Sequence, residues 1–187
     1  MSKIEANTID SISGTSTLTL GSSNASTIAL GSGDVQSNFL YPAFHAQRSS
    51  DQSFTNDTYV KIQFDTESID TNNCYDNSSN YRFTPTIAGK YYIYVSITGK
   101  STNNLYSTRL ALYKNGSAIR YAIDTNGTNA SYPLNEQTPY IGMVVDMNGS
   151  SDYLEGYVNI QTHNGSSVDS NANGTYFGGY RIGTWVY

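Results

Sequence analysis

The chain has 187 residues, of which 13% are charged and 13% aromatic, and its formal net charge is −5. This length suits one domain with a short appendage, and the abundant Ser, Thr, Asn and Tyr disfavour a helical bundle or a doubly wound α/β fold. The ten Lys and Arg residues are scattered singly through an acidic chain, which excludes nucleic acid as the main partner.

Residues 1–38 form a repetitive segment without an aromatic side chain. The run TLTLGS at 17–22 recurs as TIALGS at 27–32, and each copy places two aliphatic side chains on one face of a short strand before a glycine turn. Because one chain cannot bury so narrow an apolar edge, we interpret the segment as a docking or trimerisation stalk. A flexible linker is the alternative. The interface candidates in this segment are Leu18, Leu20, Ile28 and Leu30.

From Phe39 onward, turn signals separate short runs typical of β-strands, and no window shows a helical stripe longer than one or two turns. The Asn-Gly pair at 115–116 predicts a hairpin. The predicted strands cover residues 59–64, 81–83, 91–98, 105–114, 117–124, 140–147, 153–162 and 175–187. This pattern predicts an all-β sandwich of about eight to ten strands over residues 39–187.

Alternation within two of these runs identifies candidate core residues. In the first run, one face carries Tyr91, Ile93, Val95 and Ile97, and the opposite face carries Tyr92, Tyr94, Ser96 and Thr98. The second run places together Ile141, Met143, Val145 and Met147. We expect the aliphatic-rich faces to form the core.

Four motifs in this region, taken in order, resemble the C1q globular domain, whose jelly roll is shared with the tumour necrosis factor superfamily. They are Phe44-His45-Ala46, the segment 80–92, the run LALYKNGS at 110–117 and the run YFGGYRI at 176–182. The resemblance implies an antiparallel jelly-roll head and a homotrimer whose axis is lined by the sheet that holds the first and last strands. It makes interface candidates of Tyr176, Phe177, Tyr180 and Trp185, with packing inside the subunit's own core as the alternative for each.

The N-terminal segment has a second resemblance. Its runs NTID at 7–10, SGT at 13–15 and LTLG at 18–21 are similar to the opening of small structural proteins of marine tailed bacteriophages. This resemblance implies a virion structural protein, a fibre, spike or capsid or tail appendage. Residues 1–38 would bind other virion proteins, and the head would face a host glycan or receptor. The chain lacks the apolar run of a signal peptide or membrane span, so we expect synthesis in the host cytoplasm and no membrane insertion.

The sequence offers little for catalysis or metal binding. His45 and His163 have no Ser or Cys motif beside them, so we predict no enzymatic activity and no catalytic residue. Residues 65–76 are rich in Asp, Glu and Asn, which makes bound calcium one interpretation and side chains that cap their own turns the other. We assign no metal ligand and no cofactor. Cys74 is the only cysteine, and we interpret it as a passive side chain.

The 17 tyrosines exceed the needs of one sandwich core, and tyrosine suits subunit interfaces and recognition surfaces. The surface-recognition candidates are Tyr75, Tyr106, Tyr121 and Tyr132, for which stacking on a sugar ring and simple solvation are both open. Two other functions also remain open. One is a monomeric carbohydrate-binding module, and the other is a polysaccharide-degrading tail protein with a pair of carboxylates in a groove.

Overall fold

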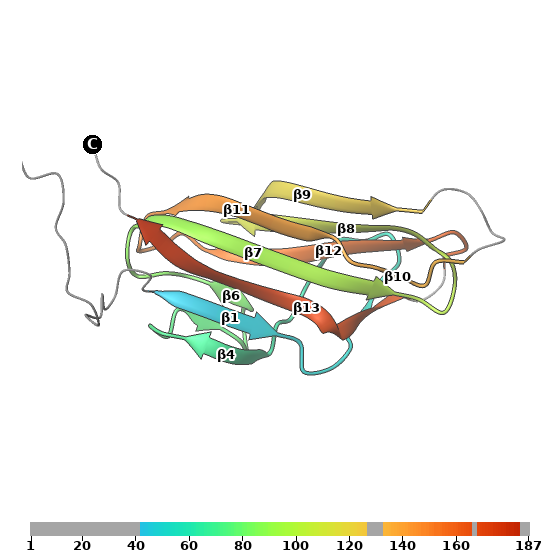
Figure 1. Cartoon of the computed structure of the whole chain (residues 1–187), viewed down its shortest axis with the longest axis horizontal. Coiled ribbons are helices and arrows are strands. Elements are labelled where there is room, and N and C mark those ends of the chain that lie inside the picture. The colour runs from blue at the N-terminus through green and yellow to red at the C-terminus, as the bar shows by residue number, and fades with distance from the viewer. Residues whose placement is uncertain (1–41, 127–132, 166–167, 184–187) are drawn as a thin grey trace, which may run out of the picture. The chain divides into compact units, whose positions relative to one another are not determined.

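The computed structural model describes residues 42–126, 133–165 and 168–183, which form thirteen β-strands in two antiparallel sheets (Figure 1). Five of these strands have only two residues, so eight longer strands remain, in agreement with the number expected from the sequence. The all-β prediction is confirmed. The described residues contain no helix that could cross a membrane.

The seven-stranded sheet contains both the first and the last strand. Its members are β1 (Ala43–Gln47), β2 (Ser53–Phe54), β4 (Thr66–Asp70), β7 (Gly89–Lys100), β10 (Glu136–Gln137), β11 (Tyr140–Met147) and β13 (Val168–Gly183). The order is β10-β7-β13-β1-β4, and β11 and β2 pair with β7 and β13. Strands β1 and β13 are therefore neighbours, as the C1q resemblance implies.

The six-stranded sheet packs against the first. Its members are β3 (Val60–Lys61), β5 (Tyr75–Asp76), β6 (Arg82–Phe83), β8 (Leu105–Lys114), β9 (Ser117–Thr125) and β12 (Leu154–Thr162). The order is β5-β6-β12-β8-β9, with β3 paired to β12. Asn115 and Gly116 join β8 to β9 with φ values of 52° and 80°. Positive φ at both positions is the mark of a tight hairpin turn, so the predicted hairpin is confirmed.

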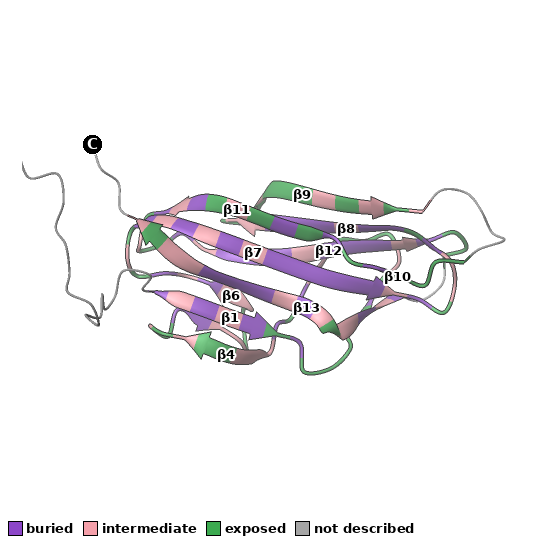
Figure 2. Cartoon of the chain, in the orientation of Figure 1, coloured by how far each residue is buried: buried purple, intermediate pink, exposed green. Residues whose placement is uncertain are grey.

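The core lies between the sheets, and the first half of β7 alternates between buried and half-buried residues, seen as banding in Figure 2, because every second side chain points into the core. The face of β7 that was predicted to be in the core is completely buried: Tyr91, Ile93, Val95 and Ile97. Strand β11 contributes Ile141, Val145 and Met147, with Met143 partly buried beside them. The six-stranded sheet contributes Leu110, Leu112, Leu154, Val158 and Ile160. Each such aliphatic side chain contributes about 1.5–3 kcal/mol by leaving water.

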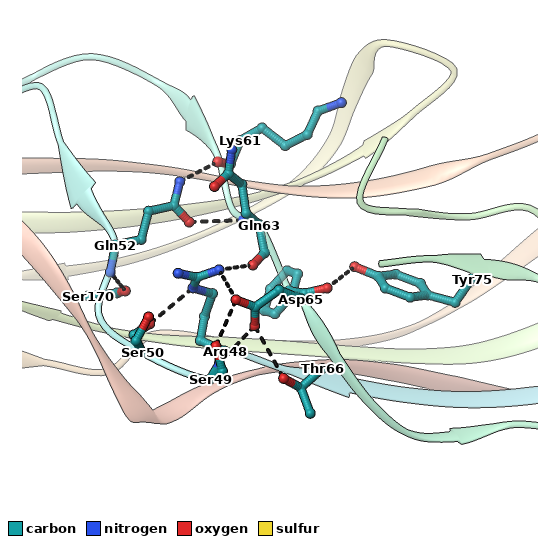
Figure 3. Close-up of polar contacts among 11 residues, drawn as sticks. Arg48, Ser49, Ser50, Gln52, Lys61, Gln63, Asp65, Thr66, Tyr75 and Ser170 are labelled. Carbon is teal, nitrogen blue, oxygen red and sulfur yellow. Dashed lines mark hydrogen bonds and ion pairs between the residues drawn. The ribbon is translucent and has the colours of Figure 1, made fainter. Parts of the chain in front are cut away.

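Arg48 holds the chain that leaves β1 (Figure 3). Its guanidinium donates to the carbonyl oxygen of Gln63, to the carboxylate of Asp65 at 2.8 Å and to the carbonyl oxygen of Ser50 at 3.1 Å. Gln52 strengthens the connection, since its amide donates to the carbonyl of Lys61 at 3.0 Å and its oxygen accepts from the amide of Gln63 at 2.9 Å. These bonds join the exit of β1 to the segment between β3 and β4.

The structure differs from the sequence prediction in several places. The last strand begins at Val168 and not at residue 175, and the short strands β2 and β10 were not expected. The strand expected at 59–64 is reduced to β3, although Ile62 and Phe64 still point into the core and are fully buried. The polar segment 65–76 contains β4 and β5, which were not expected. Both lie at the ends of their sheets, where few apolar side chains are needed. The N-terminal segment 1–38 lies outside the described residues.

Candidate functional site

The most continuous feature of the surface is the outer side of the seven-stranded sheet. His45 on β1 lies opposite Gly178 on β13, Gly178 lies opposite Tyr94 on β7, and Tyr94 lies opposite Gly142 on β11. A parallel row runs from Tyr180 through Tyr92 to Val144. We call this surface the tyrosine face, and we define it by His45, Ile69, Tyr92, Tyr94, Tyr140, Val144, Tyr176 and Tyr180.

Two glycines allow the rings of the tyrosine face to lie close against the sheet. A Cβ atom on Gly178 would lie 2.6 Å from ring carbon Cε2 of Tyr94. A Cβ atom on Gly142 would lie 2.7 Å from the hydroxyl oxygen of Tyr92 and 3.0 Å from Cε1 of Tyr140. Real side chains do not approach so closely, so each glycine leaves a space that a neighbouring tyrosine fills. The result is an aromatic surface whose rings lie directly on the backbone at Gly178 and Gly142.

The rings contact one another across four strands. Tyr92 lies 5.7 Å from Tyr180 and 6.4 Å from Tyr94, measured between ring centroids. Tyr94 and His45 each pack on Tyr176, at 6.2 Å and 5.9 Å. The hydroxyl oxygens of Tyr92 and Tyr140 lie 3.2 Å apart. Such tilted pairs each contribute about 0.5–1.5 kcal/mol beyond the area that they bury.

The tyrosine face carries no net charge at neutral pH. Partial burial lowers the pKa of His45, and its Nδ1 lies 3.0 Å from the hydroxyl oxygen of Tyr94. The hydrogen bond with Tyr92 is the main reason that the pKa of Tyr140 rises to about 12. Beyond the rings, at the start of β7, Lys90 forms an ion pair of 3.1 Å with Asp146. An uncharged aromatic centre beside a polar rim is the composition typical of a protein–protein interface.

Several residues of the tyrosine face are unusually exposed for their size. Tyr140, Val144 and Ile69 have 49%, 47% and 50% of their surface accessible. Tyr140 and Val144 lie together beside Tyr92 at the β11 edge of the sheet, and Ile69 lies beside His45 at the β4 edge. The tyrosine rings between them therefore join the exposed apolar side chains into one surface. A patch of this kind marks an association surface.

The sequence candidates for the trimer interface divide between surface and core. Tyr176 and Tyr180 lie on the tyrosine face. Phe177 does not: it is fully buried, with its ring packed edge-on against Phe44 at 4.9 Å. Alternation along β13 turns Phe177 to the opposite side from its neighbours, so its interpretation as an interface residue is corrected to packing in its own core. The remaining candidates lie outside the described residues: Leu18, Leu20, Ile28, Leu30 and Trp185.

The surface-recognition candidates also need one correction. Tyr75 is 5% exposed, its ring stacks on Phe44 at 5.1 Å, and its hydroxyl donates to the carbonyl of Phe64 at 3.3 Å. It is a core residue and cannot contact a partner. Tyr106 and Tyr121 are 37% and 50% exposed but lie apart, since Tyr106 packs against His163 and Tyr121 against Tyr59. Tyr132 lies outside the described residues.

Sequence reasoning did not identify six members of the tyrosine face, namely His45, Ile69, Tyr92, Tyr94, Tyr140 and Val144. A signal was present, because the run 91–98 places Tyr92 and Tyr94 on the face away from the core. That signal gives no information about which strands lie beside β7. The register that brings His45 and Gly178 next to Tyr94 is visible only in the folded sheet.

The oxygen-rich segment 65–76 uses its carboxylates on its own backbone. Asp70 accepts hydrogen bonds from the amides of Cys74 and Tyr75 at 3.0 Å and 3.1 Å. Asp76 accepts from the amide of Ser79 at 2.8 Å, and this bond is the main cause that lowers its pKa to about 2. These bonds are those that the turn-capping interpretation expects. Among the described residues, no group of three His, Cys, Asp or Glu side chains is placed to hold a metal ion.

Comparisons with known proteins agree with this architecture. The family profile of the C1q domain matches residues 43–182. Among solved structures, the chain is similar to Eiger TNF from S. frugiperda, with a TM-score of 0.57 and 10% identity over 78% of this chain and 94% of that chain. It is also similar to murine APRIL, with a TM-score of 0.55 and 9% identity over 75% and 98% of the two chains. At such identities the likeness concerns the fold alone. No curated protein sequence matches.

Proposed function

The chain belongs to the C1q domain family, and from this premise we propose that it is a non-enzymatic structural protein of a bacteriophage virion, assembled as a homotrimer through the tyrosine face. Domains of the C1q and tumour necrosis factor type typically form homotrimers. The observation that carries the proposal is the continuous, uncharged aromatic surface on the sheet that holds β1 and β13. Three copies of this surface around one axis would cover their half-exposed side chains, such as Tyr140 and Val144.

The virion role rests on the N-terminal segment. Its repeated Leu-x-Leu and Ile-x-Leu units resemble the opening of phage structural proteins, and a segment of this kind attaches a head to a particle. The head then presents three identical outer surfaces to the host. Three weak sites on one rigid body gain affinity through effective concentration, without any new contact. This combination supports a fibre, spike or capsid or tail appendage.

Light scattering on the full chain tests the trimer by comparing the native mass of wild-type protein with that of a variant that carries a lysine in the tyrosine face. We expect wild-type protein to have about three times the chain mass of 20.5 kDa. Val144→Lys should give a folded protein of single-chain mass, because assembly would bury an unpaired ammonium group. Leu134→Lys is the matched control: Leu134 is 40% exposed and lies outside the tyrosine face. Wild-type protein of single-chain mass would overturn the trimer and favour a monomeric binding module.

Mass spectrometry of purified particles tests the virion role independently. Particles obtained from an infected host culture should contain the chain at a stoichiometry divisible by three. Absence of the chain from particles, with abundant protein in the lysate, would contradict a structural role. That result would leave the trimer itself intact.

A further inference from the structure

A second aromatic cluster covers the outer side of the six-stranded sheet, on the opposite side of the sandwich from the tyrosine face. Along β12, Leu154, Val158 and Ile160 point into the core, so Tyr157 points outward. Ala111 on β8 lies between Tyr157 on β12 and Tyr121 on β9. We call this surface the tyrosine platform, and we define it by Tyr59, Tyr113, Tyr121 and Tyr157.

The platform rings pack in two pairs over the sheet. Tyr113 and Tyr157 are tilted by 31° with their centroids 4.2 Å apart, and Tyr59 meets Tyr121 edge-on at 6.2 Å. Ala111, although it points outward, has no accessible surface. The rings therefore present an apolar surface to solvent, with hydroxyl groups around it.

A buried glutamate arranges two cations beside this surface. The carboxylate of Glu155 is 3% exposed and lies 2.6 Å from Nζ of Lys61 and 2.9 Å from Nη2 of Arg82. Lys61 lies above the ring of Tyr157 at 5.8 Å, and Arg82 lies above the ring of Tyr153 at 4.1 Å. The two cations are about one quarter exposed. The two positive groups are therefore accessible to solvent, whereas the carboxylate with which they form ion pairs is not.

The other side of the platform adds hydrogen-bonding groups. Arg109, one third exposed, lies 3.9 Å from the carboxylate of Asp57, which accepts from the amide of Asn159 at 3.2 Å. Asn159 is 4% exposed, and its Oδ1 accepts no hydrogen bond from any described residue. Because this oxygen has almost no accessible surface, the half-exposed carboxylate of Asp57 is the acceptor that a hydroxyl group of a bound molecule could reach.

We propose that the tyrosine platform binds an acidic polysaccharide. The apolar faces of pyranose rings would pack on the tyrosines, and sugar carboxylates would pair with Lys61, Arg82 and Arg109. Lys61, Arg82 and Arg109 outnumber the carboxylates of Glu155 and Asp57 by one, so the rim of the platform carries a net positive charge within an acidic chain, which favours a polyanion. The tyrosine face has no comparable ring of cations, so the two aromatic surfaces differ in the partner that they suit.

Single-stranded nucleic acid is the main competing occupant, because stacking on aromatic rings beside cations is also its mode of binding. The platform suits it less well. The hydroxyl groups of a sugar acid can donate to the half-exposed carboxylate of Asp57, whereas a phosphate beside the same carboxylate would be repelled by it.

Affinity electrophoresis of the full chain in gels that contain polygalacturonate tests the proposal, with neutral dextran and single-stranded poly(dT) as comparators. We expect retardation by polygalacturonate only. Tyr121→Ala should weaken binding by roughly five- to tenfold, the value of one aromatic contact. Arg109→Gln should weaken it by about threefold and remove part of the salt dependence. Tyr106→Ala is the matched control, since Tyr106 is exposed on the same sheet but packs against His163, outside the platform.

Four results would overturn the proposal: no retardation by polygalacturonate, equal retardation by dextran, stronger binding of poly(dT), or an unchanged affinity in Tyr121→Ala. All residues of the platform come from one copy, so it goes beyond the proposed trimer and fails separately from it. If the protein has single-chain mass and polygalacturonate retards it, the proposed trimer is contradicted and the platform is supported. If the protein is a trimer and migrates freely, the trimer is supported and the platform is contradicted.

Discussion

The ring of Tyr94 lies on Gly178, the residue opposite it on the neighbouring strand, in the space that a side chain would otherwise fill. We therefore expect Gly178→Ala to lift the ring from the sheet and to break its contact with His45. The domain should remain folded, because the ring can turn into solvent, but the tyrosine face would lose its flat surface. We expect the variant trimer to dissociate at a protein concentration at least about tenfold higher than the concentration at which the wild-type trimer dissociates. Light scattering over a dilution series measures this change.

The control for this variant is Gly183→Ala in the same strand. A Cβ atom there would meet nothing within 4 Å, so the added methyl should have no effect on assembly. Identical dilution curves for Gly178→Ala and wild type would show that Tyr94 does not contribute to the contact between subunits.

His45 should make stability depend on pH. Burial lowers its pKa in the folded protein below the ordinary value of 6.5, so the folded state favours the neutral ring. Below pH 6.5 the unfolded chain binds the proton more readily than the folded one, and stability falls as the pH falls toward the folded pKa. Urea unfolding should therefore show lower stability at about pH 5.5 than at about pH 7. In His45→Gln this difference should shrink; an equal difference in both proteins would assign it to other groups.

The alternating strands could be predicted well from the sequence. The observed bounds of β8 and β11 are those predicted from their runs, and the core face of β7 is confirmed residue by residue. The first half of β7 and much of β11 alternate because one side faces the core and the other does not. Strand β4 has no such contrast, since it lies at the end of its sheet and has no buried residue. A polar edge strand looks like a loop in the sequence.

The surfaces were harder to predict than the strands. Alternation alone was enough to place Tyr92 and Tyr94 outside the core. It could not place Tyr75, which is buried because the side chains of Phe44 and Phe83 continue the core beyond the main strands. The tyrosine platform likewise depends on tertiary pairing, because Tyr59 and Tyr121 meet across segments far apart in the chain.

Cys74 should be inert in the folded protein. Its side chain is buried, and burial together with the nearby Asp70 carboxylate raises the pKa of the thiol. Because the thiolate is the reactive species, we expect no reaction with a disulfide reagent such as DTNB over hours in native buffer. Unfolding in guanidinium should release one reactive thiol per chain. Rapid stoichiometric reaction without denaturant would show that the loop around Cys74 opens readily.

Arg48 should be the most costly ion-pair residue to replace. It is 8% exposed and bonds to Ser50, Gln63 and Asp65, so Arg48→Met removes the donor to the carbonyls of Ser50 and Gln63 and the positive charge beside Asp65. We expect a loss of about 2 kcal/mol in the free energy of unfolding, measured in urea with an unchanged m value. Lys100→Gln is the control, because its ion pair with Asp51 lies at the surface, where water and salt screen it, and its loss should hardly change the free energy of unfolding. Equal losses in the two variants would mean that the Arg48 network does not hold the exit of β1.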